Sequence, residues 1–182
     1  SNENIKRYGL DKFFFEIADL YKKRKMPNRI ILSGKKGLGK STLSYHLINY
    51  ILSTNEDLPY DQKNLVINKN NKSYKLVKNN SHPNFYLIDL FDGKKNINID
   101  QIREMISYTN KSSFNNLPKF ILIDNIEFLN KNSINALLKV VEEPNDNVFF
   151  FFINNSEHNL LPTLNSRCIK FNINLTFNEV VN

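Results

Sequence analysis

The chain has 182 residues, of which 41% are hydrophobic, and these numbers suit one globular domain with a core of its own. The longest apolar run, residues 148–153 (VFFFFI), is far shorter than the roughly 20 residues that a membrane-spanning helix needs, so we expect no membrane contact. The single cysteine, Cys168, excludes an intrachain disulfide and a cysteine-rich zinc module. We therefore expect no zinc and a reducing, cytoplasmic setting.

The formal net charge is +7, from 25 Lys and Arg against 18 Asp and Glu. Such an excess is compatible with an electrostatic partner such as DNA. Lys and Asn are, however, spread along the whole chain, which is also typical of proteins from AT-rich genomes. The charge alone therefore leaves contact with DNA open.

The first half of the chain predicts two helices around one strand. Apolar residues at three- and four-residue spacing predict amphipathic helices over residues 10–21 and 40–52. Between them, residues 29–33 (RIILS) have the composition of a short buried strand, and a glycine-rich turn follows. Residues 53–82 are polar and rich in Asn and Lys, so we interpret them as a variable insertion, with short elements at 65–67 and 74–77.

The second half repeats this alternation. Apolar strands are predicted at residues 84–89 (NFYLID), 119–124 (KFILID), 148–154 and 168–173. Asn98 and Gln101 have the spacing of a capping box at the start of a helix that runs to Thr109. A further helix begins after Asn130 or Asn132, and a short one is expected at 160–164. Strands that alternate with helices predict an α/β fold with a five-stranded parallel sheet between helices.

The strongest motif is residues 34–41 (GKKGLGKS), which satisfies G-x-x-x-x-G-K-[ST] between a predicted strand and a predicted helix. Its glycines allow the backbone N–H groups to face a phosphate at the positive end of that helix. Lys40 would contact the β- and γ-phosphates, and the Ser41 hydroxyl would bind Mg²⁺. The alternative is an ordinary glycine-rich turn. We expect ATP or ADP with Mg²⁺ to bind at Gly34, Gly37, Leu38, Gly39, Lys40, Ser41 and Thr42.

The predicted strand 119–124 ends in Asp124, where P-loop enzymes have an aspartate that holds Mg²⁺. Asp124 is therefore the second expected metal ligand, with Ser41. Many P-loop hydrolases have a glutamate next to this aspartate, but here the residue is Asn125, and a neutral amide cannot accept a proton from water. Glu127 could replace it only if the chain stays extended there. We expect ATP hydrolysis at this site to be weak or absent.

Together, the P-loop and residues 100–103 (DQIR), 119–124, 135–144 (NALLKVVEEP) and 161–168 (LPTLNSRC) resemble bacterial clamp-loader AAA+ subunits. The resemblance covers nearly the whole chain and is weak only across residues 53–82. It implies a RecA-like AAA+ nucleotide-binding domain over residues 1–175. Thr176 and Glu179 have capping-box spacing, so residues 176–182 are interpreted as the start of a following helical domain, with the lid and collar domains outside this fragment.

Two types of clamp-loader subunit share these motifs. The gamma/tau motor normally has a four-cysteine zinc module and an Asp-Glu pair, and this chain has neither. The delta prime type often lacks both and keeps the Ser-Arg-Cys motif, so the resemblance favours it. It implies assembly with gamma/tau and delta in a hetero-oligomeric ring of the DNA polymerase III holoenzyme, which loads the sliding clamp on primer–template DNA during replication. The alternative is an active gamma/tau-like ATPase. A nucleoside kinase is disfavoured, because we find no lid arginines or acceptor-site residues.

The resemblance also assigns Arg167 a role in trans, as an arginine finger on the γ-phosphate bound by a neighbouring subunit. The alternative is a surface arginine paired with a nearby carboxylate. Asn154 or Asn155 falls where AAA+ proteins have a polar sensor residue near the γ-phosphate. We take Asn154 as the sensor, but a plain strand-end asparagine is an open alternative. Cys168 is interpreted as a small buried apolar residue, since no histidine neighbours it in sequence.

Overall fold

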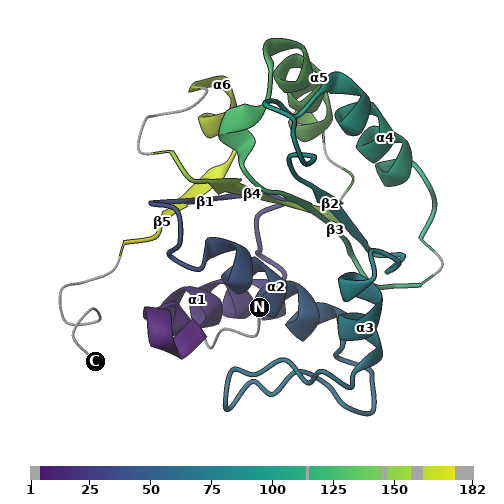
Figure 1. The fold of residues 1–182 in the computed structure, drawn as a ribbon. Helices are drawn as coiled ribbons and strands as arrows, with labels where there is room; N and C mark the ends of the chain where they lie inside the picture. The colour runs from purple at the N-terminus through teal and green to yellow at the C-terminus, as the bar shows by residue number, and fades with distance from the viewer. Residues whose placement is uncertain (1–4, 114, 144, 146, 157–161, 175–182) are drawn as a thin grey trace.

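The computed structural model describes residues 5–113, 115–143, 145, 147–156 and 162–174. Within them, a five-stranded sheet in the order β2-β3-β4-β1-β5 lies between two layers of helices (Figure 1). All four strand pairings are parallel, which confirms the predicted fold class. The expected start of a second domain at 176–182 lies outside the described residues.

The elements follow the predicted alternation closely. The strands are β1 (Arg29–Ser33), β2 (Phe85–Ile88), β3 (Lys119–Ile123), β4 (Val148–Asn154) and β5 (Ile169–Asn172). The helices are α1 (Asp11–Lys22), α2 (Lys40–Leu52), α3 (Lys72–Lys78), α4 (Ile99–Thr109), α5 (Lys131–Glu142) and α6 (Pro162–Asn165), with 3-10 turns η1 (Ile5–Tyr8) and η2 (Ile126–Phe128). The predicted strands are confirmed with shifts of one residue at some ends.

The inner strands β1, β3 and β4 are mostly apolar and buried because helices cover both faces of the sheet (Figure 1), whereas the edge strand β5 is largely exposed. In β1, Ile30 and Leu32 belong to the core cluster with α1 and α2, whereas Ile31 belongs to the cluster with α4 and α5. The same alternation continues in β4, where Phe151 and Phe150 belong to opposite clusters. Successive side chains of a strand therefore pack against opposite helical layers.

Side-chain caps set the starts of the two helices on the α4–α5 side. The Asn98 side chain accepts from the Gln101 N–H at 3.1 Å, and Gln101 Oε1 accepts from the Asn98 N–H at 3.1 Å, so the predicted capping box is confirmed. At α5, Asn130 is the cap, and its side chain accepts from the Ser133 N–H at 2.9 Å. Of the two candidates for this cap, Asn130 is therefore correct.

The insertion packs against α2 through buried polar contacts. Its main element is α3, which contains the predicted element at 74–77, while the predicted element at 65–67 is reduced to an antiparallel bridge between Asp61 and Val66. The side-chain amides of Asn49 in α2 and Asn71 bond reciprocally at 3.2 and 3.0 Å. The described part of the chain contains no helix with the length and apolarity that a bilayer crossing requires.

Candidate nucleotide-binding site

The candidate site lies where the carboxyl ends of three strands meet. β1 leads into the glycine-rich loop, Asp124 follows β3, and β4 ends at Asn154. In parallel α/β sheets this edge is where ligands bind. A cavity of about 220 Å³ opens there, lined by Lys36, Gly37, Gly39, Lys40, Ser41, Thr42, Asp124, Asn125, Ile153 and Asn155. The structure thus brings together most of the residues that the sequence predicts.

The loop needs glycine at its two ends. The Gly34 N–H donates to the Asn154 carbonyl at 3.2 Å, and a Cβ on Gly34 would lie 2.3 Å from the Ile173 carbonyl oxygen. Gly39 caps α2 in the left-handed conformation, with φ 80°. Between them, Leu38 packs against the core below the loop. The loop is therefore fixed between β4 and the segment after β5, and the amino end of α2 faces the cavity.

Lys40 holds the loop in its curled shape. Its side chain is buried, with 2% exposure of the residue, and Nζ donates to the carbonyls of Gly34 at 2.8 Å and Lys35 at 2.5 Å. Burial lowers the pKa of Lys40, whereas the charges of Asp124 and Glu127 oppose this shift. The ammonium group is thus placed within the loop, where a phosphate would compete with these two carbonyls for it.

Ser41 and Asp124, the two expected metal ligands, lie in contact. Ser41 Oγ donates to Asp124 Oδ2 at 3.2 Å. Burial raises the pKa of Asp124, and the nearby Asp89 carboxylate raises it further, while hydrogen bonds from Asn125, Ser41 and Asn155 act in the opposite direction. Hydroxyl and carboxylate oxygens are hard ligands of the kind that Mg²⁺ prefers. The donor set therefore fits a magnesium-bound nucleotide phosphate.

The chain does not stay extended after Asp124. Asn125 adopts the left-handed conformation, with φ 54° and ψ 49°, and η2 begins at the next residue. Asparagine tolerates this conformation better than most residues. The turn leaves the Glu127 carboxylate as an acceptor for the Asn155 N–H at 3.3 Å. The condition under which Glu127 could replace the missing glutamate is thus not met.

Asn125 connects the ends of three strands through its side chain. Its Nδ2 donates to Asp89 Oδ1 after β2 at 2.7 Å, and its Oδ1 accepts from Asn155 Nδ2 after β4 at 2.9 Å. Asp89 was not among the predicted site residues. The sequence could have indicated Asp89, because residues 84–89 (NFYLID) end in an aspartate after an apolar strand in the same way as residues 119–124 (KFILID).

The two asparagines at the end of β4 differ in placement. Asn154 is buried at 5% exposure, and its Nδ2 donates to Ser33 Oγ at 3.1 Å, away from the cavity lining. Asn155 lines the cavity and its Nδ2 lies 3.5 Å from Asp124 Oδ1. The geometry therefore favours Asn155, not Asn154, as the polar residue nearest to a bound phosphate.

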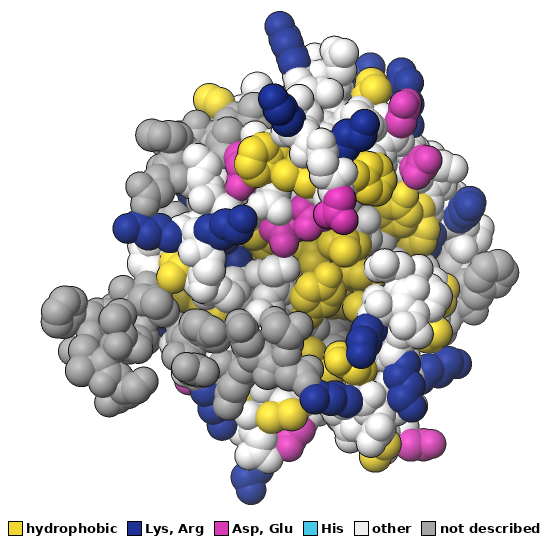
Figure 2. All heavy atoms as spheres, in the orientation of Figure 1, with side chains coloured by type: hydrophobic (Ala, Val, Ile, Leu, Met, Phe, Trp, Pro, Cys, Tyr) yellow, Lys and Arg dark blue, Asp and Glu magenta, His cyan; other side chains and the backbone are white. Residues whose placement is uncertain are grey.

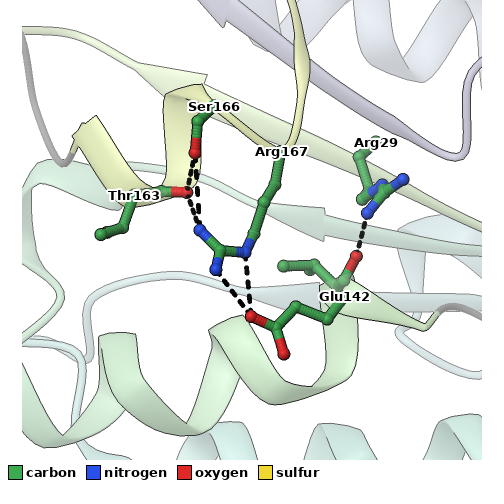
Figure 3. Close-up of polar contacts among 6 residues, drawn as sticks. Arg29, Glu142, Thr163, Ser166 and Arg167 are labelled. Atoms are coloured by element: carbon green, nitrogen blue, oxygen red, sulfur yellow. Dashed lines mark hydrogen bonds and ion pairs between the residues drawn. The ribbon is translucent and has the colours of Figure 1, made fainter.

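Arg167 is not part of this cavity. Ile169, two residues later, pairs with Ile30 near the start of β1, so Arg167 lies at the amino ends of the strands. Its Nε and Nη2 donate to Glu142 Oε1 at 3.1 and 2.6 Å, and its Nη1 donates to the Thr163 carbonyl at 2.7 Å (Figure 3). Within this chain, Arg167 thus makes a surface ion pair. Cys168 is partly buried, and burial raises the pKa of its thiol to about 11, so it is no ready nucleophile.

The charged side chains are unevenly distributed over the surface. Figure 2 shows acidic side chains gathered near the centre of one face, beside hydrophobic ones, with Lys and Arg around the periphery. The basic residues on this face therefore do not form one continuous patch.

A phosphate-binding loop between β1 and α2, with an aspartate directly after β3, defines a P-loop nucleotide-binding domain. Solved structures share this fold. A DNA polymerase III gamma-subunit-related protein of Thermotoga maritima aligns over 97% of this chain and 47% of its own, with a TM-score of 0.59 and 19% identity. The RuvB branch-migration motor of the same organism aligns over 90% of this chain and 44% of its own, with a TM-score of 0.50 and 17% identity. The fold is that of AAA+ P-loop proteins.

Sequence relatives define the family. Residues 10–176 match the family model of the DNA polymerase III delta subunit. The delta prime subunit of Haemophilus influenzae is 27% identical over 168 residues, which are 92% of this chain and 49% of the relative. That of Escherichia coli is 26% identical over 155 residues, 85% of this chain and 45% of the relative. The chain belongs to the DNA polymerase III delta-subunit family, and it is a clamp-loader AAA+ domain of the delta prime type.

The relatives also include the motor type. A gamma subunit of Buchnera aphidicola subsp. Schizaphis graminum is 32% identical over 153 residues, 82% of this chain and 39% of the relative. This chain spans about half or less of the length of each of these curated relatives.

Proposed function

We propose that this domain is the nucleotide-binding part of a delta prime subunit that assists ATP hydrolysis in its neighbours and hydrolyses little ATP itself. In this proposal it assembles with gamma/tau and delta subunits in a ring. The ring loads the sliding clamp on primer–template DNA during replication, and Arg167 contacts the nucleotide of the adjacent subunit. The family membership supports the clamp-loader setting. The geometry of the domain supports a subunit that contributes an arginine to its neighbour and hydrolyses little ATP in its own pocket.

The placement of Arg167 carries the proposal. The P-loop follows the carboxyl end of β1, whereas Arg167 lies beside its amino end. The five residues of β1 span roughly 16 Å at about 3.3 Å per residue, which is longer than an arginine side chain. Arg167 therefore cannot reach the phosphates bound by its own P-loop. A catalytic role for this side chain requires a nucleotide held by another subunit.

Among the described residues that line this domain's pocket, the one carboxylate is Asp124, which is assigned to Mg²⁺. Asn125 occupies the place of the usual glutamate, and both ends of its side-chain amide are engaged, by Asp89 and Asn155. An amide has no basic site for the proton that the attacking water must lose. The chain turns at Asn125, so Glu127 does not take over this role. The pocket is suited to bind a nucleotide, not to cleave it.

The binding residues of this chain have separable tasks. The loop amides and Lys40 would hold the phosphates, while Ser41 and Asp124 would hold Mg²⁺, which neutralises phosphate charge when bound. Asn155 would contact the terminal phosphate from the side of β4. These contacts order the nucleotide without supplying a base.

A reconstituted loader with full-length subunits tests the proposed role of Arg167. Arg167→Ala is expected to leave assembly intact. It should slow ATP hydrolysis at the neighbouring site that Arg167 contacts by roughly 10³-fold or more, as seen for arginine fingers. Arg103→Ala is the matched control, because Arg103 is an exposed arginine paired with Asp100 at 3.4 Å. Unchanged DNA- and clamp-stimulated ATPase activity in Arg167→Ala would remove the proposed role.

The rival assignment, an active gamma-like ATPase, makes the opposite prediction for the isolated protein. Turnover of ATP by the purified protein at about one per second, within the usual range of enzymes, would contradict the proposed delta prime role if Lys40→Ala abolished it. We expect no Lys40-dependent turnover.

A further inference from the structure

Two arginines from different parts of the chain meet at the carboxyl end of α5. Arg29, the first residue of β1, donates from Nη1 to the Val141 carbonyl. Arg167, between α6 and β5, contacts Glu142, the next residue and the last of the helix (Figure 3). Helix carboxyl ends attract cations because their carbonyls carry partial negative charge. The end of α5 is therefore fastened to β1 through Arg29, and it presents Glu142 to Arg167.

The contacts of Arg167 fix the orientation of its guanidinium plane. Glu142 Oε1 accepts from both Nε and Nη2, and the Thr163 carbonyl accepts from Nη1 on another edge of the same plane. Ser166 Oγ is a longer contact of Nη1, at 3.4 Å. Because the guanidinium is planar and rigid, contacts on two of its edges determine its direction.

The remaining donors suit a phosphate. Each Nη atom carries two N–H groups, and the contacts with Glu142 and Thr163 use one on each. One N–H of Nη2 has no contact among the described residues, and the second N–H of Nη1 makes only the long contact with Ser166 Oγ. A phosphate oxygen would bond to Nη2 and would compete with Ser166 for Nη1. The Arg167 side chain is 32% exposed, so an acceptor from another chain can reach it.

The ion pair itself contributes little to folding. The Glu142 side chain is 51% exposed, and solvent screens pairs of this kind strongly. Its physical consequence is orientation, because an arginine held in place loses less freedom when the phosphate arrives. Glu143, the next residue, is exposed and contacts no arginine among the described residues.

We propose, on the basis of the proposed trans role of Arg167, that Glu142 is a positioning residue for this arginine finger. It holds the guanidinium in a fixed orientation, still partly exposed, before a neighbouring subunit presents its nucleotide. Glu142 acts only through Arg167 and does not contact the phosphate.

The test uses the reconstituted loader with full-length subunits. Glu142→Gln is expected to lower the kcat of DNA- and clamp-stimulated ATP hydrolysis by about three- to tenfold, since small misplacements of catalytic groups have effects of up to about 10²-fold. The KM for ATP and assembly are expected to stay unchanged, because the nucleotide is bound by the neighbour. Glu142→Asp should recover part of the rate, and Glu143→Gln is the matched control with no expected effect.

Thermal denaturation separates positioning from a structural ion pair. Glu142→Gln is expected to keep the Tm of the natural protein while its stimulated kcat falls, because a solvent-screened pair contributes little to stability. A normal or faster rate in Glu142→Gln, in a loader where Arg167→Ala is inactive, would overturn the positioning role alone. Normal activity in Arg167→Ala would instead overturn the proposed function, so the two failures are distinguishable.

Discussion

At the end of β3, Asp124 has a carboxylate whose charge is unfavourable in the folded protein. Burial and the charge of Asp89 raise its pKa above the value in the unfolded chain. The folded state then binds the proton more tightly, so ionisation lowers stability above the folded pKa, and this cost vanishes below the unfolded pKa of about 3.9. The carboxylate that we propose as a ligand of Mg²⁺ thus lowers the stability of the nucleotide-free domain.

We predict that Asp124→Asn raises the Tm of the nucleotide-free domain by a few degrees at pH 7 and has little effect near pH 3. Thermal denaturation followed by circular dichroism at both pH values measures this difference. The same variant should lose Mg²⁺-dependent nucleotide binding. A lower Tm at pH 7 would show that the hydrogen bonds from Ser41 and Asn155 outweigh the unfavourable charge.

His82 gives the fold a pH dependence of the opposite sense. Its Nδ1 accepts from the Asn84 N–H at 3.0 Å, which requires an unprotonated Nδ1, and Nε2 lies 3.2 Å from Ser73 Oγ. Burial lowers the pKa of His82, and Lys72 adds to this, while Glu56 opposes it. The unfolded chain therefore takes up the proton first as the pH falls below about 6.5.

We predict that the free energy of unfolding falls between pH 7 and pH 5, and that His82→Asn reduces this slope. Asparagine keeps an acceptor near the Asn84 N–H but does not titrate. Urea denaturation at several pH values measures the slope. Equal slopes in both proteins would exclude His82 as the source.

Individual site residues differ in how far sequence reveals them. The placement of Gly34, Lys40, Ser41 and Asp124 at one edge of the sheet was predictable because it depends on local spacing next to a strand. The pairing of Arg167 with a particular carboxylate was not, because Glu142 lies 25 positions away in sequence. The choice between Asn154 and Asn155 depended on the direction of a single side chain at the end of β4.

At the scale of elements, local signals were reliable where the pattern was long or chemically specific. The apolar strands and the capping box at Asn98 need no distant partner for their identification. The insertion was harder to predict because its elements depend on distant side chains. Glu56 accepts from the N–H groups of Lys72 at 2.7 Å and Ser73 at 2.9 Å and so caps α3 from 16 residues upstream.

We predict that Glu56→Ala lowers the free energy of unfolding by about 2 kcal/mol, because hydrogen bonds to a charged group contribute about 1.5–3 kcal/mol. The matched control is Asp57→Ala, which removes an adjacent exposed carboxylate. Urea denaturation compares the two variants. A similar loss in both would indicate a general charge effect and not a cap on α3.

For the molecule as a whole, nucleotide binding is expected to stabilise the fold, since the pocket joins the ends of β1, β3 and β4. With MgADP at 100 times its Kd, the gain is about 2.7 kcal/mol. A thermal-shift titration measures it, and Lys40→Ala should abolish it. Lys23→Ala, which removes an exposed lysine paired with Asp19, should not. The absence of any shift in the natural protein would mean that the loop does not bind nucleotide.

Because its phosphate loop and Arg167 lie at opposite ends of β1, the domain has two different surfaces for contact with neighbouring subunits. A contact between the Arg167 surface of one subunit and the phosphate-loop surface of the next is heterologous. Such contacts close into a ring only when the rotation between adjacent subunits allows it. Such a ring is directional, since each subunit places its arginine at the nucleotide site of the next subunit and receives one from the preceding subunit. A subunit that supplies an arginine to its neighbour but does not hydrolyse its own nucleotide would occupy the first position of the ring.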